Sequence, residues 1–462
     1  TGAMADICHK NGVAVSGVAS VPFGGHDDWF SAFRGMTGLS SDAVGKFLYY
    51  HGVDGLGYNS EWSGYSPSGL ITMHDALKAY MADRNPLWEV IWYGGTTDGG
   101  SCSFDIGIAS SKTLFRSASI FLNYNWNRQS YYEQSVQTAN SMGKSPFYIY
   151  AGMNQQGGEP KSGENYSLIK DWQYSIGVWG AHTENMFWES RNAGGASVEA
   201  MQRYYLNTTE RWYTNGPRNP AVRLPIKTVR DHRPRADWAG ISSMMSARSP
   251  LAWDITNEPF ITYFNLGNGK FFNWMGQRIS NSEWYSLAVQ DYLPTWRWWL
   301  TPEFMQGEVA EGGWNLAADF TWDDAYFGGS CLQVTGTTAD EYLHLFKTKF
   351  DVDYGQTLTV RYKILEGEAD VNLVLSSFDN PTEINDVLEV LTVGKSDKQI
   401  DASLQEWQTA TFALGDAVIV EDLQDNGGLG VIALEFKNAK NLKFLLGEIS
   451  IKSDEAAATP AT

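Results

Sequence analysis

The feature that most constrains the fold of this chain is a series of strand-length apolar runs separated by segments with helical spacing. The runs lie at residues 12–21, 53–62, 87–94, 119–126, 147–154, 174–182, 239–247 and 255–266. Stretches such as SPSGLITMHDALKAYMADRN (66–85) and YYEQSVQTANSMGK (131–144) lie between them. Because strands that alternate with helices form parallel sheets, the runs predict an α/β fold, a (β/α)8 TIM barrel.

The order of the runs leaves the first strand of the barrel unaccounted for. The chain opens on a helix-like segment, GAMADICHKNG (2–12), whereas a TIM barrel opens on a strand. The eighth run contains Pro259 and continues into a loop-like segment. We therefore expect the first strand to be missing from this chain and one of the eight runs to be irregular or split. For the same reason the lack of a visible signal peptide is uninformative.

The sequence pattern changes near residue 300. Helical spacers disappear, and residues 342–378 alternate with period two between breaks at Gly and Asp. Short strands without helices predict an antiparallel β-sandwich of the jelly-roll, carbohydrate-binding type. The predicted domains are the barrel at 1–301 and the sandwich at 302–453. The small polar residues 454–462 are typical of a linker or disordered tail.

Composition and charge narrow the class of partner. The formal net charge is −19, which would repel a nucleic-acid backbone or an anionic membrane surface. No apolar run reaches the roughly 18 residues that a membrane span needs. Aromatic residues make up 14% of the chain, and Trp and Tyr combine flat apolar faces with a polar group, which suits sugars. Large aromatic cores are the alternative interpretation of this composition.

Metal and cofactor chemistry has no support in the sequence. Cys8, Cys102 and Cys331 show no CxxC or metal-type spacing, and no HxH or HExxH pattern is present. His182 stands alone near a strand end, where a histidine more often has a structural hydrogen bond. We predict no metal and no cofactor.

The strand-like segment DGLGYNSEW (54–62) ends in an amide and a carboxylate two residues apart, Asn59 and Glu61. Successive side chains of a strand alternate between faces, so these two share a face. In a barrel, the carboxyl ends of the strands hold the active site. The alternative is a strand-end carboxylate paired with a surface lysine.

The other predicted strand ends carry amide and aromatic side chains suited to sugar hydroxyls and ring faces. The predicted substrate-binding residues are Trp62, Trp92, Asn123, Trp126, Asn154, Gln156, Trp179, Trp188 and Asn265. A pocket with one candidate acid and many neutral polar groups is typical of glycoside hydrolysis.

The amide beside the acid indicates an unusual glycosidase mechanism. Ordinary glycosidases use two carboxylates, and an amide cannot form a glycosyl ester. Asn59 can instead hold the 2-acetamido group of GlcNAc, so that the carbonyl oxygen of the substrate attacks the anomeric carbon. Glu61 would be the general acid and then the general base, which requires a pKa above its ordinary value.

A second acidic motif, Asn257-Glu258-Pro259, matches the acid/base string of many retaining barrel glycosidases. It falls near the end of the predicted barrel, and no further strand with a nucleophilic Glu follows it. We therefore do not assign Glu258 a catalytic role.

On these residues the chain resembles glycoside hydrolase family 85, the endo-β-N-acetylglucosaminidases, over about residues 1–300. The resemblance rests on HKNGVAVSG (9–17), GVDGLGYNSEW (52–62), IWYGG (91–95), FLNYNW (121–126), PFITYFNLGNGKFF (259–272) and EWYSLAVQDYLPTWRWW (283–299). It matches the catalytic Asn-x-Glu pair at Asn59 and Glu61, the active-site Tyr at Tyr93 and the Trp of the NY-x-W stretch at Trp126. It also explains NEPF as part of a late-barrel segment.

The resemblance implies cleavage of the β-1,4 bond between the two GlcNAc residues of an N-glycan core, with retention and an oxazoline intermediate. The implied partners are N-glycoproteins and free N-glycans of high-mannose or trimmed core type, and transglycosylation is implied as well. Acidic, aromatic-rich composition and an appended sandwich suggest a secreted, periplasmic or cell-surface bacterial protein.

Several positions depart from the pattern of the family. Gly94 replaces an Asp, Phe104-Asp105 replaces a Trp-Gln pair, and Asn154 and Gln156 stand where an Asp is usual. These changes bear on glycan preference, and they motivate the alternative of a non-catalytic glycan-binding protein. A family 18 chitinase-like enzyme is a third hypothesis, which Asn59 disfavours because that family has Asp at the matching position.

Overall fold

A computed structural model gives the structure of the chain. It describes residues 2–21, 41–60, 67–94, 97–101, 103, 107–123, 126, 128–154, 173–180, 197, 199–203, 205, 251–253, 259–294, 299–305, 315–392, 405–417 and 420–453. The chain divides into two units. The first comprises residues 1–9, 13–193 and 223–245, and the second comprises 10–12, 194–222 and 246–462.

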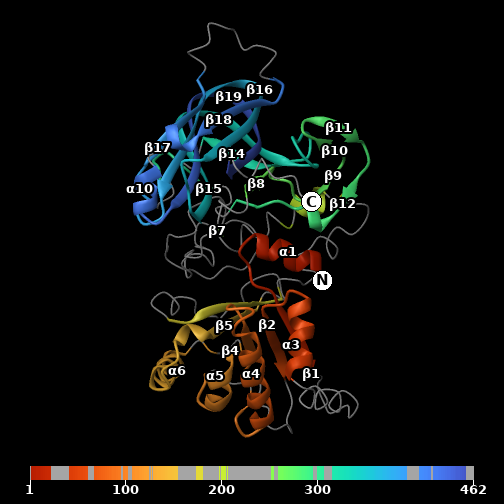
Figure 1. Cartoon of the computed structure of the whole chain (residues 1–462), viewed down its shortest axis with the longest axis vertical. Helices are drawn as coiled ribbons and strands as arrows, with labels where there is room; N and C mark the ends of the chain where they lie inside the picture. The colour runs from red at the N-terminus through yellow and green to blue at the C-terminus, as the bar shows by residue number, and fades with distance from the viewer. Residues whose placement is uncertain are drawn as a thin grey trace. The chain divides into compact units, whose positions relative to one another are not determined.

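The first unit contains a six-stranded parallel sheet in the order β1-β2-β3-β4-β5-β6 (Figure 1). The strands are β1 (Ser16–Val21), β2 (Gly55–Ser60), β3 (Glu89–Tyr93), β4 (Ser119–Phe121), β5 (Ile149–Asn154) and β6 (Ser175–Trp179). The helices are α1 (Gly2–Lys10), α3 (Ser41–Tyr50), α4 (Pro67–Met81), α5 (Lys112–Ser117) and α6 (Gln129–Ser141), with a 3-10 turn η1 (Pro146–Tyr148). This alternation confirms the predicted α/β class and forms a TIM-like half-barrel. The predicted run at 239–247 lies outside the described residues.

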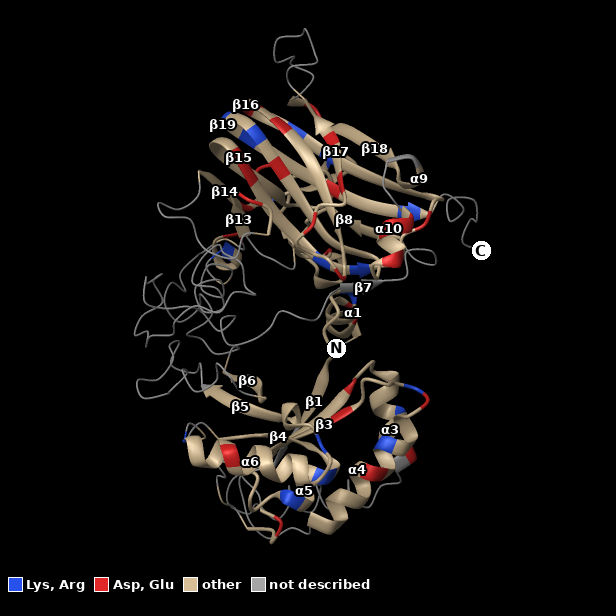
Figure 2. Cartoon of the chain, turned by 90° about the vertical axis from the view of Figure 1, so that its left-hand side faces the viewer, with Lys and Arg blue, Asp and Glu red and all other residues tan. Residues whose placement is uncertain are grey.

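The helices α3 to α6 cover one face of this sheet (Figures 1 and 2). Helix α4 shows why: its buried residues Leu70, Met73, Leu77 and Met81 recur at helical spacing and form one apolar stripe. Burying each such side chain contributes roughly 1.5–3 kcal/mol. His74 lies on the same stripe and contacts the rings of Tyr58 and Trp92 from the sheet.

A buried carboxylate fixes the start of β2. Asp54 accepts hydrogen bonds from Val15 N (2.6 Å), His9 Nε2 (2.6 Å) and Asn85 Nδ2 (2.9 Å). Burial alone would raise the pKa of Asp54, but these hydrogen bonds outweigh it and lower the pKa. The contacts join α1, β1 and the end of the α4–β3 connection to the strand that carries Asn59.

The second unit contains a nine-stranded sheet whose central path is β13-β15-β19-β16-β17. Its strands are β7 (Leu251–Trp253), β8 (Phe260–Thr262), β13 (Trp299–Thr301), β14 (Leu316–Thr321), β15 (Cys331–Phe350), β16 (Gln356–Ser377), β17 (Asp386–Leu391), β18 (Gln408–Ala413) and β19 (Leu429–Ser453). Smaller elements are β9 (Asn268–Gly269), β10 (Phe272–Trp274), β11 (Gln277–Ser280), β12 (Trp284–Tyr285), η4 (Leu287–Val289), α9 (Leu414–Ala417) and α10 (Val420–Asp425).

The three long strands β15, β16 and β19 bend where they pair with one another. The pairing register of these strands shifts next to Gly336 in β15 and on both sides of Gly367 in β16. The residues of β19 that face these shifts lie between Lys437 and Leu442. Gly367 has a φ of +74°, and a Cβ there would lie 2.3 Å from Asn441 O. Such bends allow one long strand to contribute to both layers of a β-sandwich, and the two layers enclose the core between them.

The predicted boundary at residue 301 is wrong, because the eighth apolar run belongs to the sandwich. β8 pairs with β19 in the register Phe260↔Ile451, and β7 pairs with β15. The ring of Phe260 is buried against Phe346 and Phe350. Residues 246–301 therefore group with the second unit, and the run at 255–266 is not a barrel strand. The predicted tail at 454–462 lies outside the described residues.

The described residues were also compared with the requirements of a membrane-spanning helix and of a disulfide bond. No helix among them has both the length and the apolar character needed to cross a membrane. Cys8 and Cys331 both carry free thiols, and Cys331 is buried.

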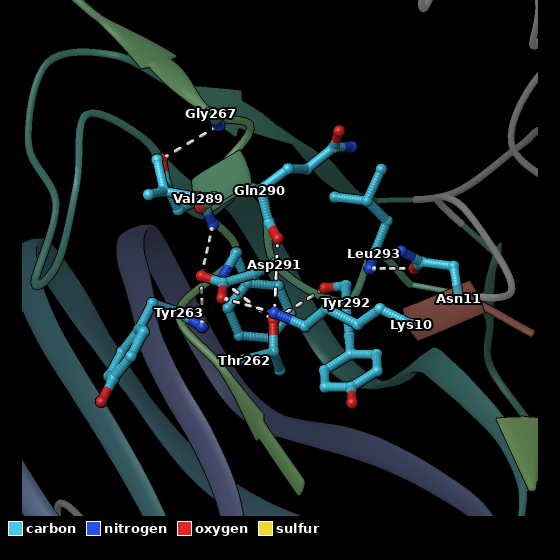
Figure 3. A network of polar contacts seen from close by, with 12 residues as sticks. Lys10, Asn11, Thr262, Tyr263, Gly267, Val289, Gln290, Asp291, Tyr292 and Leu293 are labelled. Carbon is cyan, nitrogen blue, oxygen red and sulfur yellow. Dashed lines mark hydrogen bonds and ion pairs between the residues drawn. The ribbon is translucent and has the colours of Figure 1, made fainter. Parts of the chain in front are cut away.

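A polar network in the second unit surrounds the buried carboxylate of Asp291 (Figure 3). Asp291 accepts hydrogen bonds from Tyr263 N (3.1 Å) and Asn265 N (3.3 Å), and Lys10 Nζ lies 3.4 Å from its other oxygen. Lys10 also lies over the ring of Tyr292, 4.7 Å from its centroid. Burial raises the pKa of Asp291 from 3.8 to about 6, because it outweighs the opposing effects of Lys10 and the two N–H groups.

This pKa predicts a pH dependence of stability. Between about pH 4 and pH 6 folded Asp291 keeps a proton that the unfolded chain has released, so the free energy of unfolding falls as the pH rises. Asp291→Asn removes this titration. Denaturant unfolding of both proteins at about pH 4.5 and about pH 7 measures this effect. Between these two pH values, the free energy of unfolding of wild type should fall by about 2 kcal/mol more than that of the variant. Equal losses in both proteins would contradict the assignment.

Candidate functional site

The candidate site lies at the carboxyl ends of the parallel strands in the first unit. Asn59 is the fifth residue of β2 and pairs in register with Ser20 of β1. Its neighbour Tyr58 packs against His74 of α4 and is buried. Because side chains alternate along a strand, the half-buried Asn59 points to the opposite face, away from the helices.

Tyr93 and Asn123 come together on this face, opposite to the one that the helices cover. Asn123 Nδ2 donates a hydrogen bond to the phenolic oxygen of Tyr93 at 3.0 Å. The ring of Trp179, at the end of β6, lies parallel to that of Tyr93, with centroids 6.5 Å apart and an interplanar angle of 20°. Three residues that were predicted separately from β3, β4 and β6 thus form one cluster. Tyr93 is 8% exposed, so this cluster is largely preorganised.

Phe121 is a member of this cluster that sequence reasoning missed. Its ring contacts both Tyr93 and Trp179. Gly177 makes room for it, since a Cβ at residue 177 would lie 2.2 Å from the Phe121 ring. The glycine within the β6 run was the available signal, because a glycine inside a strand often marks the close approach of another group.

The structure describes only some of the remaining residues that the sequence predicted for the site. Asn154 ends β5 in register with Trp179, so its backbone lies at the same edge, although its side chain is not among those described. Glu61, Trp62, Gln156 and Trp188 lie outside the described residues, as do His182 and Glu258. Gly94, one of the departures from the family pattern, donates its backbone N–H to Phe121 O at 2.7 Å.

Three of the predicted substrate contacts are corrected by the structure. Trp92 is 0% exposed and packs between Tyr58 and His74 on the helix-covered face, since it alternates with Tyr93. Trp126 is 1% exposed and donates its indole N–H to Gly152 O at 2.8 Å. Asn265 is 0% exposed, donates to Val289 O at 2.7 Å and accepts from Gly267 N. These side chains support the fold.

A second polar cluster lies at the amino ends of the same strands. Glu89, at the start of β3, accepts hydrogen bonds from Ser119 Oγ and from Tyr150 OH, the latter at 3.2 Å. Burial and the neighbouring Glu89 carboxylate raise the pKa of Tyr150. The carboxylate of Glu89 is therefore engaged at the edge of the sheet opposite to Asn59.

The chemistry available at the carboxyl edge follows from these groups. It offers an amide at Asn59, a phenol held by an amide at Tyr93 and a stacked indole face at Trp179. Neutral hydrogen-bonding groups together with ring faces are what a sugar requires. Among the described residues, no group of three or more His, Cys, Asp and Glu side chains could hold a metal ion.

The Tyr93–Asn123 hydrogen bond predicts the effect of Tyr93→Phe. The substitution keeps the ring and its packing but leaves the Asn123 N–H without its acceptor, so the free energy of unfolding should fall by only about 1 kcal/mol. The sequence predicts that the site acts on a glycan, and the turnover of such a substrate should fall by about tenfold or more, because one oriented hydroxyl is lost. Initial rates and urea unfolding measured side by side test this; a proportionate loss of stability and activity would contradict it.

The TIM-like parallel sheet, the polar and aromatic groups at its carboxyl edge and the β-sandwich define an α/β class of protein with an additional β domain. The model of glycosyl hydrolase family 85 matches residues 2–272, so the chain belongs to this family, as its sequence motifs predicted.

Known proteins that are similar to the chain include the following two. A protein of Danio rerio, described as cytosolic endo-beta-N-acetylglucosaminidase, is 22% identical over 309 residues. The match covers 64% of this chain and 36% of that protein, so the chain spans about a third of the length of this curated relative. The glycoside hydrolase domain of Endo-D from Streptococcus pneumoniae R6 has the same fold, with a TM-score of 0.74 and 22% identity over 97% of this chain and 68% of that one.

Proposed function

We propose that the chain is an endo-β-N-acetylglucosaminidase that hydrolyses the β-1,4 bond of the GlcNAc-GlcNAc core of N-glycans. The observation that carries the proposal is the position of Asn59, on the same sheet face as the hydrogen-bonded Tyr93 and Asn123, in a chain of family 85. The activity named for the Danio rerio relative supports the same reaction.

In the proposed mechanism the substrate supplies its own nucleophile. The side-chain oxygen of Asn59 accepts the acetamido N–H of the GlcNAc before the scissile bond, which increases the electron density on the acetamido carbonyl. That oxygen attacks the anomeric carbon while Glu61 protonates the leaving oxygen, and an oxazolinium ion that keeps the acetamido N–H forms. Glu61 then deprotonates the incoming water, which opens the oxazolinium ring with net retention. A sugar hydroxyl in place of water gives transglycosylation.

Tyr93 and Trp179 have supporting roles in this proposal. The phenol of Tyr93, oriented by Asn123, hydrogen-bonds the reacting sugar, and the exposed part of the Trp179 ring covers an apolar sugar face. The proposed substrates are N-glycoproteins and free N-glycans of high-mannose or trimmed core type. We also propose a secreted, periplasmic or cell-surface location in a bacterium, which fractionation of producing cells would test.

The experiment that tests the proposal is digestion of a high-mannose glycoprotein. Mass spectrometry should show protein that retains a single GlcNAc and a released glycan with one GlcNAc at its reducing end. Tight binding of the glycan without turnover would instead favour the non-catalytic alternative that the departures at Gly94 and Asn154 motivated.

A further inference from the structure

A cavity of about 500 Å³ opens at the amino edge of the parallel sheet, opposite to the candidate catalytic edge. Its walls come from the amino ends of β3 and β4, the ends of α4 and α5, and the connection from α6 to η1. Its lining includes Lys78, Arg116, Lys144, Glu89, Trp88 and Tyr148. This volume is in the range of small-molecule sites.

The charge of this cavity is opposite to that of the chain. Three of its lining residues are cations, Lys78, Arg116 and Lys144, and one, Glu89, is an acid. The chain as a whole carries a formal charge of −19. Figure 2 shows blue, basic positions on α4 and α5, the two helices that supply Lys78 and Arg116. Clusters of one sign in a concave site concentrate ligands of the other sign.

The cations of the cavity outnumber its one acidic residue, Glu89. Within the part of the chain that the structure describes, neither Lys78 nor Arg116 has an ion pair or a side-chain hydrogen bond. Lys144 donates to Phe115 O (2.5 Å) and Ala118 O (2.7 Å), which leaves one of its three N–H groups. Burial and the neighbouring Lys78 lower the pKa of Lys144 to about 8, because together they outweigh the opposing effect of Glu89. A bound anion would relieve this repulsion.

The remaining walls suit a ring rather than a bare ion. The side chains of Trp88, Tyr148 and Pro86 are flat and apolar, and Ser117, Ser119 and Ser145 add hydroxyl groups. The indole N–H of Trp88 is buried and has no hydrogen-bond acceptor among the residues described.

We propose that this amino-edge cavity binds a monosaccharide-sized molecule that carries a phosphate or a carboxylate, with its charged group held by Lys78, Arg116 and Lys144. The site does not depend on the proposed hydrolase activity, because it lies at the other edge of the sheet and uses none of the same residues.

Isothermal titration calorimetry with glucose 6-phosphate as the probe tests the proposal, with glucuronate and neutral glucose as comparisons. We expect the two anionic sugars to bind and glucose to bind at least about tenfold more weakly. The double variant Lys78→Gln/Arg116→Gln should weaken glucose 6-phosphate binding by about tenfold or more. Both side chains are exposed, so the thermal unfolding midpoint should stay unchanged without ligand.

Lys112→Gln is the matched control, because it removes one exposed cation from the same helix α5 without altering the lining of the cavity. This variant should bind glucose 6-phosphate as wild type does. No binding of either anionic sugar to wild type would overturn the proposal. Equal binding by the double variant, or an equal loss in Lys112→Gln, would also overturn it.

Discussion

Replacing Glu61 by glutamine should reduce glycan release by about 10²–10⁴-fold, because the side chain can then neither protonate the leaving oxygen nor deprotonate water. The substitution keeps the shape of the side chain, so substrate affinity and the thermal unfolding midpoint should change little. Initial rates of glycan release from a high-mannose glycoprotein, measured beside calorimetric binding of the same glycan, separate the two effects.

Glu89→Gln is the matched control for this experiment. Glu89 is a carboxylate at the start of β3, and it is engaged by Ser119 and Tyr150 at the amino edge of the sheet. This variant should keep the wild-type rate. Full activity in Glu61→Gln would remove Glu61 from the acid and base roles, and a loss in both variants would point to a structural effect on the sheet.

Replacing Asn59 by alanine should have the second largest effect, and it should depend on the donor. With a natural N-glycan, hydrolysis should fall by about 10²–10³-fold, since the acetamido group is no longer oriented or polarised for attack. With a preformed sugar oxazoline as donor, transfer to a GlcNAc acceptor should continue near the wild-type rate, because the step that needs Asn59 has already taken place.

Asn123→Ala serves as the comparison for this prediction. Asn123 orients Tyr93 and does not act on the acetamido group in the proposed mechanism, so its loss should affect both donors alike. The quantity to compare is the ratio of oxazoline transfer to glycan hydrolysis in each variant. A ratio in Asn59→Ala no higher than in Asn123→Ala would exclude the acetamido-holding role.

Strands β2 and β3 show what the alternation of side chains along a strand can predict and what it cannot. Alternation in GLGYNS and EVIWY predicts that Asn59 and Tyr58 face opposite ways, and likewise Tyr93 and Trp92. The parallel sheet confirms that these residues stand at neighbouring strand ends. Alternation does not say which of the two faces is covered by helices, so Trp92 was predicted to contact the substrate. Its burial depends on His74 and the α4 stripe, which are distant in sequence.

Two other corrections have the same origin in long-range contacts. Nothing local distinguishes Phe-Ile-Thr of β8 from a barrel strand, and its assignment to the sandwich depends on Ile449 and Ile451, almost two hundred residues later. Asn265 is polar and lies in a motif of the family, yet its amide stabilises the loop around Asp291. The polar character of a side chain does not reveal whether its partner will be a ligand or the backbone.

The amino-acid sequence alone determined the alternating strands and helices, the change to β structure near residue 300 and the acid–amide pair of DGLGYNSEW, because these depend on spacing between near neighbours. The tertiary structure alone decided which strand faces are open, where the sandwich begins and which lysines and arginine surround the amino-edge cavity. Those properties arise from pairing and burial between segments far apart along the chain, and local periodicity carries no information about such pairs.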